Sequence, residues 1–293
     1  MDEFSLIDTI VDALGEVVTG KQVVLGPGDD AAIFAPRQGF ETVASIDTLV
    51  AERHFPAGAP RQDIGYRAMM VSLSDLAAMG AEPGYVLIAL TLPDVDEPWV
   101  RSLALGIAEA ADVTGVVVAG GNLSRGPLSI TVSVHGEVPE GRGVTRQRAQ
   151  IGDLVQVSGE LGGAAACVRL GAFENGPPDL RARYYRPAAR FDVINTVRKA
   201  HACIDISDGL LQDLQHILRA SDCGASVSSQ AVPVHADAEL DDALWGGDDY
   251  ELLAIAPDGL PGFHTIGQIE AAPGLQLDGE TVPANKGYDH FRE

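Results

Sequence analysis

Two adjacent carboxylates stand in a turn near the N-terminus that the sequence makes rigid. Asp29 and Asp30 follow Gly26, Pro27 and Gly28, where the glycines permit unusual backbone angles and the proline fixes one φ angle. Neighbouring acids held in this way repel each other unless hydrogen bonds or a cation offset the repulsion. The stretch also fits the loose dinucleotide pattern G-x-G-x-x-A, but its acids would repel a pyrophosphate. The turn therefore favours a metal ion that bridges to phosphate.

Two further acids lie in apolar stretches of the N-terminal half. Asp47 follows a predicted buried strand over residues 42–46, where α/β folds place ligand chemistry, although a turn-capping role also accounts for this residue taken alone. Asp75 lies in a predicted helix over residues 61–80, among small and apolar residues, with no Lys or Arg one helical turn away. A carboxylate in that setting is expected to be at least partly buried and needs a partner, which favours a metal role over a structural one.

A third acidic motif follows another predicted strand. Residues 202–204 are apolar and lead into Asp205, and Ser207 and Asp208 come soon after it. We expect Ser207 or Asp208 to cap the helix that follows. The core face of that helix is predicted to consist of Leu210, Leu211, Leu214, Ile217 and Leu218. Capping explains one of the three polar residues but not all of them.

The sequence Gly-Asp-Asp occurs in both halves of the chain, at residues 28–30 and 247–249. Carboxylate oxygens are the ligands that Mg²⁺ prefers, and this ion usually bridges a few carboxylates to substrate phosphates. The chain has no cluster of Cys and His residues that would indicate a zinc centre. Together the acids indicate metal-assisted phosphate chemistry.

The composition limits the partners that the protein can have. Its 293 residues carry 42 Asp and Glu against 20 Lys and Arg, which gives a net charge of −22. That balance argues against binding to nucleic acid or to an anionic membrane, so a phosphorylated substrate would need metal ions. The 3 scattered cysteines indicate no disulfide framework. The acidic N-terminus and the lack of an apolar run of about 20 residues predict a cytoplasmic protein.

Helical and strand patterns alternate along the chain, which predicts an α/β (α+β) fold with mixed sheets. Helical spacing covers residues 4–14, 61–80 and 99–114, and strand patterns cover residues 23–25, 42–46, 85–92, 116–119 and 128–138. Residues 139–150 are rich in Gly and Arg and are the predicted domain boundary. The arginines in this stretch fit a phosphate contact or a solvated linker equally well. A second α/β unit is predicted from residue 153, with residues 177–190 as an exposed connection.

A set of motifs spans nearly the whole chain. The motifs are Gly-Pro-Gly-Asp-Asp-Ala-Ala at residues 26–32, Ser-Ile-Asp-Thr-Leu-Val at 45–50, His-Phe at 54–55, Ser-Asp-Leu-Ala-Ala-Met-Gly-Ala at 74–81, Arg-Gly-Pro-Leu-Ser at 125–129, Ile-Asp-Ile-Ser-Asp-Gly-Leu at 204–210, Gly-Gly-Asp-Asp-Tyr-Glu-Leu at 246–252 and Gly-Tyr-Asp-His-Phe at 287–291. Together they resemble the thiamine-monophosphate kinase family, within the superfamily that resembles aminoimidazole ribonucleotide synthetase.

The resemblance implies two mixed-sheet α/β domains and a homodimer formed through the N-terminal domains. Residues 1–140 would form a metal- and ATP-binding domain that also dimerises, and residues 141–293 would complete the active site. The implied reaction moves the γ-phosphoryl group of ATP to thiamine monophosphate, giving thiamine diphosphate and ADP. The transfer is in line and needs no general base, because the acceptor phosphate is already ionised at neutral pH.

The resemblance also assigns site residues. The implied ligands of several Mg²⁺ ions are Asp30, Ser45, Ile46, Asp47, Asp75, Asn122, Asp205 and Asp208. The implied ATP contacts are Gly121, Asn122, Arg146 and Ser207, and the implied thiamine monophosphate contacts are His54, Asp248 and Tyr288. Asp29 is then expected to hydrogen-bond within its turn and not to bind metal.

Two positions depart from the family pattern. Asn122 stands where an Asp is usual, so one ion loses a negative ligand, and Asp248 replaces a longer Glu. We hypothesise an active enzyme with one weakened metal site. The alternatives are another ATP-dependent enzyme of the same superfamily and a non-catalytic nucleotide-binding homologue.

Overall fold

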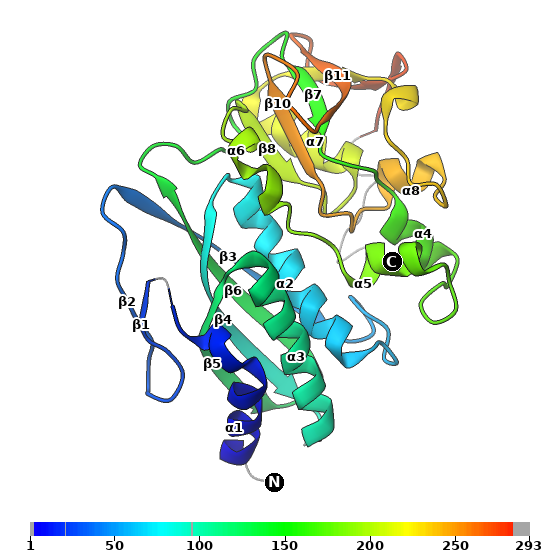
Figure 1. The fold of residues 1–293 in the computed structure, drawn as a ribbon. Coiled ribbons are helices and arrows are strands. Elements are labelled where there is room, and N and C mark those ends of the chain that lie inside the picture. Colours follow the sequence, from blue (N-terminus) through cyan, green and yellow to red (C-terminus); the bar gives the residue numbers. More distant parts are fainter. Residues whose placement is uncertain (1–2, 21, 95, 284–293) are drawn as a thin grey trace. The chain divides into compact units, whose positions relative to one another are not determined.

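The computed structural model describes residues 3–20, 22–94 and 96–283 (Figure 1). The described chain divides into two compact units. Residues up to 76 together with 81–141 form the first unit, and residues 77–80 together with 142–283 form the second. Both units combine helices with a mixed sheet, so the predicted fold class is confirmed. The roles expected of residues 1–140 and 141–293 stay predictions.

The first unit is built on a four-stranded sheet in the order β3-β6-β4-β5. Its strands are β3 (Phe40–Val50), β4 (Glu82–Leu92), β5 (Val117–Arg125) and β6 (Ser129–Pro139). β6 pairs antiparallel with β3 and β4, whereas β4 and β5 are parallel. A two-stranded sheet of β1 (Val23–Leu25) and β2 (Ile33–Phe34) accompanies it.

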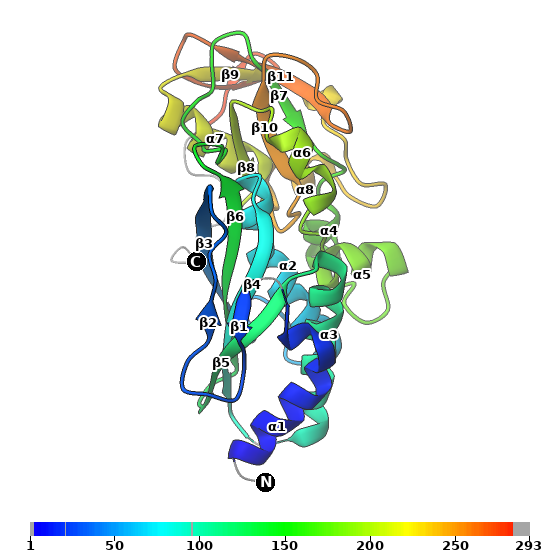
Figure 2. The same cartoon turned by 60° about the vertical axis from the view of Figure 1, so that its left-hand side comes forward.

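Helices cover one face of this sheet (Figures 1 and 2). They are α1 (Glu3–Leu14), continued by the 3-10 helix η1 (Gly15–Val18), α2 (Arg61–Ala78) and α3 (Glu97–Thr114). The alternate residues Ile130, Val132 and Val134 of β6 are fully buried, as expected of strand residues that face a core. Gly115, at φ +67°, ends α3 directly after residue 114, the last residue of the predicted helix over residues 99–114.

Two strands of the first unit run further than the sequence indicates. Asp47 was expected at the end of its strand, but β3 continues to Val50, and Asp47 lies opposite Val132 of β6. Likewise β5 passes through Gly121 and Asn122 to Arg125, with Asn122 opposite Ala89 of β4. Both expectations were wrong because pairing with the long neighbouring strands extends the ladder beyond the apolar run.

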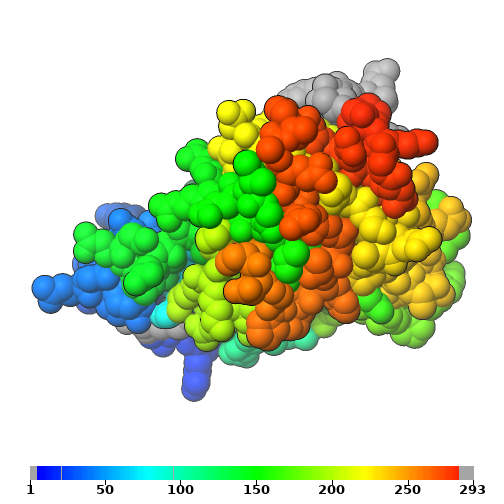
Figure 3. Space-filling model, turned by 90° about the horizontal axis from the view of Figure 1, so that it is seen from above, coloured from blue at the N-terminus to red at the C-terminus, as the bar shows by residue number. Residues whose placement is uncertain are grey.

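The second unit contains a seven-stranded sheet in the order β13-β12-β9-β11-β7-β10-β8. The strands are β7 (Leu154–Val157), β8 (Ala202–Asp205), β9 (Gly224–Val227), β10 (Leu252–Ala256), β11 (His264–Glu270), β12 (Gly274–Leu277) and β13 (Glu280–Thr281). All neighbouring strands are antiparallel except β9 and β12. Residues from β10 onward, orange to red in Figure 3, make up much of the face that this view shows.

The helices of the second unit are α4 (Gly163–Arg169), α5 (Pro178–Tyr185), α6 (Ile194–Val197), α7 (Leu210–Ser221) and α8 (Leu240–Trp245), with 3-10 helices η2 (Phe191–Val193) and η3 (Ser229–Ala231). The predicted core face of α7 is confirmed, since its leucines and its isoleucine are all buried. None of the helices within the described ranges is long and apolar enough to cross a membrane.

The expected exposed connection over residues 177–190 is instead partly a packed helix. Leu180, Tyr184 and Tyr185 of α5 are buried, and the rings of Tyr184 and Tyr185 meet edge to face with centroids 5.0 Å apart. The Phe173 ring packs against Tyr184 with its centroid 5.1 Å away. The expectation was wrong because Leu180 and Tyr184 lie one helical turn apart and share a buried face, although arginines stand between them.

Candidate metal and phosphate site

Strand β3 directs two oxygen-bearing side chains towards helix α2. Ser45 and Asp47 are two residues apart and therefore share a face of the strand. The Ser45 hydroxyl donates a hydrogen bond of 2.5 Å to Oδ2 of Asp75, and the Ser72 hydroxyl of α2 hydrogen-bonds to Asp47. The structure thus brings Ser45, Asp47 and Asp75 together, and Asp75 is half-buried, as predicted.

The electrostatics of this cluster favour a cation. Burial, together with the nearby charge of Asp75, raises the pKa of Asp47 to about 6, although the Ser72 hydrogen bond acts in the opposite direction. A divalent cation between the two carboxylates would replace their repulsion with attraction. The donors are carboxylate and hydroxyl oxygens, which fit the preference of Mg²⁺ for hard ligands. The residues present therefore fit the metal that the resemblance implies.

The glycine turn behaves partly as expected. The amide of Asp30 donates a hydrogen bond of 2.9 Å to Oδ1 of Asp29, so the prediction that Asp29 is hydrogen-bonded within the turn is confirmed. Asp30 is exposed, and its role as a metal ligand stays a prediction. Its neighbours in the turn, Gly28 included, lie in the first unit together with Asp47 and Asp75.

Two other predicted residues flank the cluster along the same part of the chain. Ile46 lies between Ser45 and Asp47 and is 63% exposed. Because its side chain carries no donor atom, only its carbonyl oxygen is suited to a metal. The imidazole ring of His54 is positioned by the backbone of β3, because its Nδ1 accepts a 3.0 Å hydrogen bond from the amide of Val50. This bond makes Nδ1 an acceptor and so fixes the tautomer when the ring is neutral.

Gly121 and Asn122 lie on β5, an edge strand of the four-stranded sheet. Both are exposed. A Cβ atom at position 121 would lie 1.9 Å from the carbonyl oxygen of Ile88 on β4, so only glycine fits there. If Asn122 binds a metal as the resemblance implies, its amide oxygen would be a neutral ligand where a carboxylate would be charged. This role of Asn122 stays a prediction.

In the second unit, β8 ends at Asp205, which is buried, and the loop that follows carries Ser207 and Asp208. The predicted side-chain cap is wrong: Gly209 occupies the N-cap position of α7, and neither Ser207 nor Asp208 caps the helix with its side chain. Instead, the carboxylate of Asp213, in the first turn of α7, accepts hydrogen bonds from backbone amides of the loop. Oδ2 of Asp213 accepts hydrogen bonds from the amides of Ser207 at 3.0 Å, Asp208 at 3.0 Å and Gly209 at 3.2 Å.

Asp213 is the residue that the sequence analysis missed. It is 2% exposed, and burial together with the charges of Asp208 and Asp205 raises its pKa to about 8. Asp208, Asp213 and His216 offer ligand atoms that all lie within 4.8 Å of one another. The signal was present, because Asp213 stands between leucines on the apolar face of α7 just as Asp75 stands among apolar residues of α2.

The loop with Asp248 lies against the loop with Ser207 within the second unit. The amide of Asp248 donates to the carbonyl oxygen of Ser207 at 2.8 Å, and the amide of Tyr250 donates to that of Ile206 at 2.9 Å. Gly247, Asp248 and Tyr250 all have positive φ angles, of 66°, 63° and 54°. The structure therefore brings together a residue expected to bind thiamine monophosphate and one expected to bind ATP.

Asp249, the second acid of this Gly-Asp-Asp sequence, has a different environment. The amide of Gly162 donates hydrogen bonds to both carboxylate oxygens of Asp249, at 2.9 Å to Oδ1 and 3.1 Å to Oδ2. Burial raises its pKa well above the usual value, and the charges of Asp248 and Glu251 act in the same direction. Asp249 thus anchors the loop to the glycine-rich turn before α4.

Arg146 and Tyr288 are the last two predicted site residues, and their binding roles, like those of the others, stay predictions. Arg146 is exposed, and its carbonyl oxygen accepts a 2.9 Å hydrogen bond from the hydroxyl of Ser221 at the end of α7. The same hydroxyl accepts the amide of Ala149 at 3.2 Å, which fixes this segment against the helix. Tyr288 lies outside the described residues.

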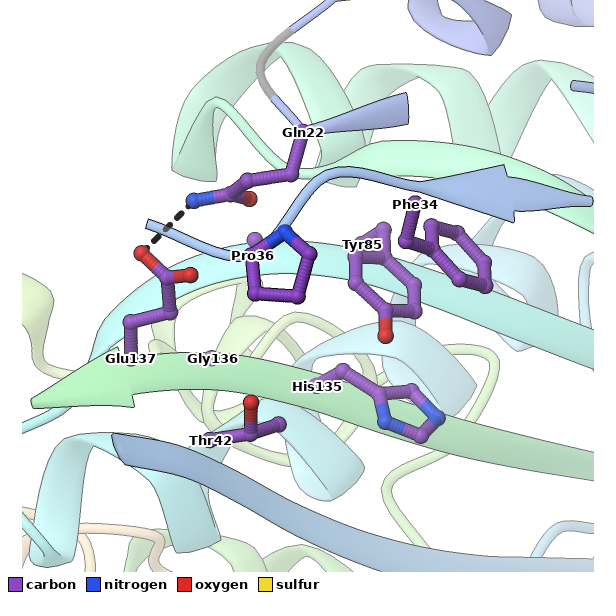
Figure 4. Close-up of a pocket in the computed structure, with 9 residues that line it drawn as sticks. Gln22, Phe34, Pro36, Thr42, Tyr85, His135, Gly136 and Glu137 are labelled. Atoms are coloured by element: carbon purple, nitrogen blue, oxygen red, sulfur yellow. Dashed lines mark hydrogen bonds between the residues drawn. The ribbon is translucent and has the colours of Figure 1, made fainter. Parts of the chain in front are cut away.

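A small cavity in the first unit lies elsewhere (Figure 4). The ring of Tyr85 is stacked between Phe34 and His135, with centroid distances of 3.7 and 4.7 Å. Beside this stack, Nε2 of Gln22 donates to Oε2 of Glu137 at 2.7 Å. The cavity measures about 30 Å³, which is room for one or two water molecules and not for a nucleotide. None of the described residues predicted for the site lines it.

Comparison with known proteins agrees with the motif pattern. Residues 28–138 match the family described as AIR synthase related protein, N-terminal domain. The chain is 40% identical to a thiamine-monophosphate kinase of Escherichia coli (strain K12), over 99% of this chain and 98% of that one.

Two solved structures extend the similarity to the fold. The thiamine-monophosphate kinase of Stenotrophomonas maltophilia K279a is 38% identical, with a TM-score of 0.86 and coverage of 96% of this chain and 98% of that chain. AaThiL complexed with AMPPCP and TMP is 31% identical, with a TM-score of 0.82 and coverage of 99% and 97%.

Proposed function

The chain belongs to the thiamine-monophosphate kinase family, and we propose that it transfers the γ-phosphoryl group of ATP to thiamine monophosphate, giving thiamine diphosphate and ADP. The observation that carries this proposal is the similarity over nearly the full length of both chains to a neighbour complexed with AMPPCP and TMP. The acids expected from the family motifs are present in both units. In this proposal residues 1–140 bind metal and ATP, and residues 141–293 complete the active site.

The proposed Mg²⁺ ligands are oxygen donors. They are the carboxylates of Asp30, Asp47, Asp75, Asp205 and Asp208, the Ser45 hydroxyl, the Ile46 carbonyl and the Asn122 amide oxygen. Bound magnesium would neutralise charge on the phosphates during transfer. The hydrogen bond between Ser45 and Asp75 supports this assignment because it places two oxygen donors close together. The raised pKa of Asp47, caused by burial and then by the charge of Asp75, shows that a cation would relieve an unfavourable charge there.

The chain's own residues have to align two phosphorylated substrates. Gly121, Asn122, Arg146 and Ser207 are proposed to hold ATP, where the guanidinium of Arg146 can bind phosphate oxygens in bidentate fashion. His54, Asp248 and Tyr288 are proposed to hold thiamine monophosphate. A phosphate monoester has a second pKa of about 6 and is a ready nucleophile at neutral pH. Alignment and charge neutralisation are therefore sufficient, and no side chain has to act as a general base.

The test is ADP release from ATP and Mg²⁺ with thiamine monophosphate compared with other phosphorylated acceptors. We expect release that depends on thiamine monophosphate and on Mg²⁺. The absence of any acceptor-dependent release would refute the kinase proposal. Release with a different acceptor would instead indicate another ATP-dependent enzyme of the same superfamily.

We propose further that the protein forms a homodimer through the first unit. In Figure 2 helices α2 and α3 lie on one side of the four-stranded sheet. Ile46 and Thr48 alternate along β3 with Ser45 and Asp47 and therefore point to the other face, and both residues are exposed. On that face Thr48 and Thr131 pair across β3 and β6, with hydroxyl oxygens 2.8 Å apart. A Thr131→Arg variant should sediment as a monomer in analytical ultracentrifugation. Val113→Arg, at an exposed position of α3, should leave the dimer intact.

A cytoplasmic location is part of the same proposal. Cys167, Cys203 and Cys223 are buried thiols without disulfide bonds, which suits a reducing compartment. Fractionation of cells that express the tagged protein would test this location.

A further inference from the structure

The carboxylate of Asp213 lies beneath the loop that leads into α7 and holds it by its backbone. One oxygen, Oδ2, accepts the amides of Ser207, Asp208 and Gly209. The side chain of Gln212 adds a 3.2 Å hydrogen bond from Nε2 to Oδ2 of Asp208. Three amides that converge on one oxygen hold the loop at three successive residues, and all three hydrogen bonds would be lost with this side chain.

A second loop, residues 246–248 after α8, packs against the first. A Cβ atom on Gly247 would lie 2.3 Å from the carbonyl oxygen of Ser207, and one on Gly209 would lie 2.9 Å from that of Trp245. Two glycines with positive φ angles therefore allow the backbones to approach closely. The hydrogen bond from the amide of Asp248 to the carbonyl of Ser207 joins the two loops directly. Movement of the loop over residues 207–209 must therefore move Asp248.

We propose that Asp213 is a positioning residue that holds the nucleotide loop over residues 207–209 and, through Ser207, the substrate loop with Asp248. The inference rests on the proposed function, which places ATP and metal contacts on the first loop and a thiamine monophosphate contact on the second. Asp213 touches neither ligand in this assignment. It acts by fixing where Ser207, Asp208 and Asp248 stand before either ligand binds.

The alternative is that Asp213 only stabilises the fold, and the chain offers a matched control. Asp153 is also buried in the second unit, and its Oδ2 accepts the amide of Gln150 and approaches Nδ1 of His201, both at 2.8 Å. Asp153→Ala removes a comparable acceptor of a hydrogen bond from a backbone amide. Asp153 itself belongs to neither loop. Asp213→Ala removes the acceptor altogether, whereas Asp213→Asn keeps one neutral oxygen and guards against a variant that fails to fold.

The test measures binding without turnover. Isothermal titration calorimetry with AMPPCP and Mg²⁺, and separately with thiamine monophosphate, compares the full-length wild type with the variants. Residues that orient metal ligands typically change affinity about 10- to 100-fold when removed. We expect a loss of that size for both ligands with Asp213→Ala and a smaller one with Asp213→Asn. Hydrogen exchange of ligand-free protein should show lost protection at residues 207–209 and 248, and Asp153→Ala should retain wild-type affinities.

Each result decides one question. Wild-type affinity for both ligands in a folded Asp213 variant would overturn the inference, and so would equal losses of affinity with Asp153→Ala. Unchanged exchange protection at residues 207–209 would also overturn it. If the wild type itself binds neither ligand, the proposed function fails, and the exchange measurement still shows whether Asp213 holds the loops.

Discussion

Replacing Asp47 with Asn should make the metal-free protein more stable, although this residue is a proposed metal ligand. Burial and the charge of Asp75 raise the pKa of Asp47 from its ordinary 3.8 to about 6. The charged carboxylate is therefore disfavoured in the folded state at neutral pH. Asn removes the charge and keeps an oxygen that can accept the Ser72 hydrogen bond.

The magnitude follows from the pKa difference. A shift of roughly two pH units corresponds to at most about 3 kcal/mol, since one unit equals about 1.4 kcal/mol. Asp47 is only half-buried, so solvent screening reduces this to about 1–2 kcal/mol. In a chain of this size each kcal/mol moves the melting temperature by roughly 2–4 °C. The Asp47→Asn variant should thus melt a few degrees higher in EDTA at pH 8.

The pH dependence of this gain identifies its cause. The folded wild type takes up its proton near pH 6, whereas the unfolded chain does so near the ordinary carboxyl value. Between these values the folded state binds more protons, so wild-type stability falls as the pH rises through this range. The advantage of the variant should be full above pH 7, shrink through pH 6 and vanish below about pH 4.

Thermal unfolding in EDTA between pH 4 and pH 8 measures this prediction, with Asp112→Asn on the exposed side of α3 as a control for lost surface charge. Added Mg²⁺ should stabilise the wild type more than Asp47→Asn, because ligand binding to the folded state raises its stability. A variant less stable than the wild type in EDTA at pH 8, or a gain that persists undiminished at pH 4, would refute the reasoning.

Three further changes test other parts of the structure. Gly121→Ala should destabilise the protein by more than about 3 kcal/mol in urea unfolding, because its Cβ would meet the backbone of β4, whereas Gly259→Ala, with open space around it, should have little effect. Asn122→Asp should lower the Mg²⁺ concentration needed for half-maximal turnover; an unchanged dependence contradicts the weakened-site hypothesis. The hydrogen bonds from Arg169 hold the pKa of Asp242 below its usual range against the effect of burial, so Arg169→Met should destabilise the protein at pH 7. That difference should fade as acid protonates Asp242, which equal losses at pH 3 and pH 7 would disprove.

The sequence correctly predicted the features that depend on residues close together in the chain. The apolar face of α7 and the end of α3 at Gly115 follow from helical spacing and from the left-handed conformation that glycine accepts. The partial burial of Asp75 followed in the same way from its apolar neighbours. These features depend on residues within one or two helical turns, which a single sequence displays.

Features that depend on distant pairing were not predicted. The extension of β3 past Asp47 comes from its ladder with β6, whose residues lie about 80 positions further along the chain. The placement of Ser207 by Asp213 depends on a loop folding back over the helix that follows it. A sequence places acids in apolar surroundings, but it does not say which donors will reach them.

Asp75 and Asp213 accept hydrogen bonds from different kinds of donor, and this difference indicates different roles for the two acids. Asp75 of α2 receives the hydroxyl of Ser45, a side chain that can rotate to leave the carboxylate to a metal. Asp213 of α7 receives three backbone amides, which cannot leave without breaking the loop. Both acids stand on apolar helix faces and look alike in the sequence. A carboxylate whose partner can move suits a metal ligand, and one whose partners are fixed suits a positioning residue, so replacing Asp75 should weaken metal binding directly whereas replacing Asp213 should weaken it through the loop.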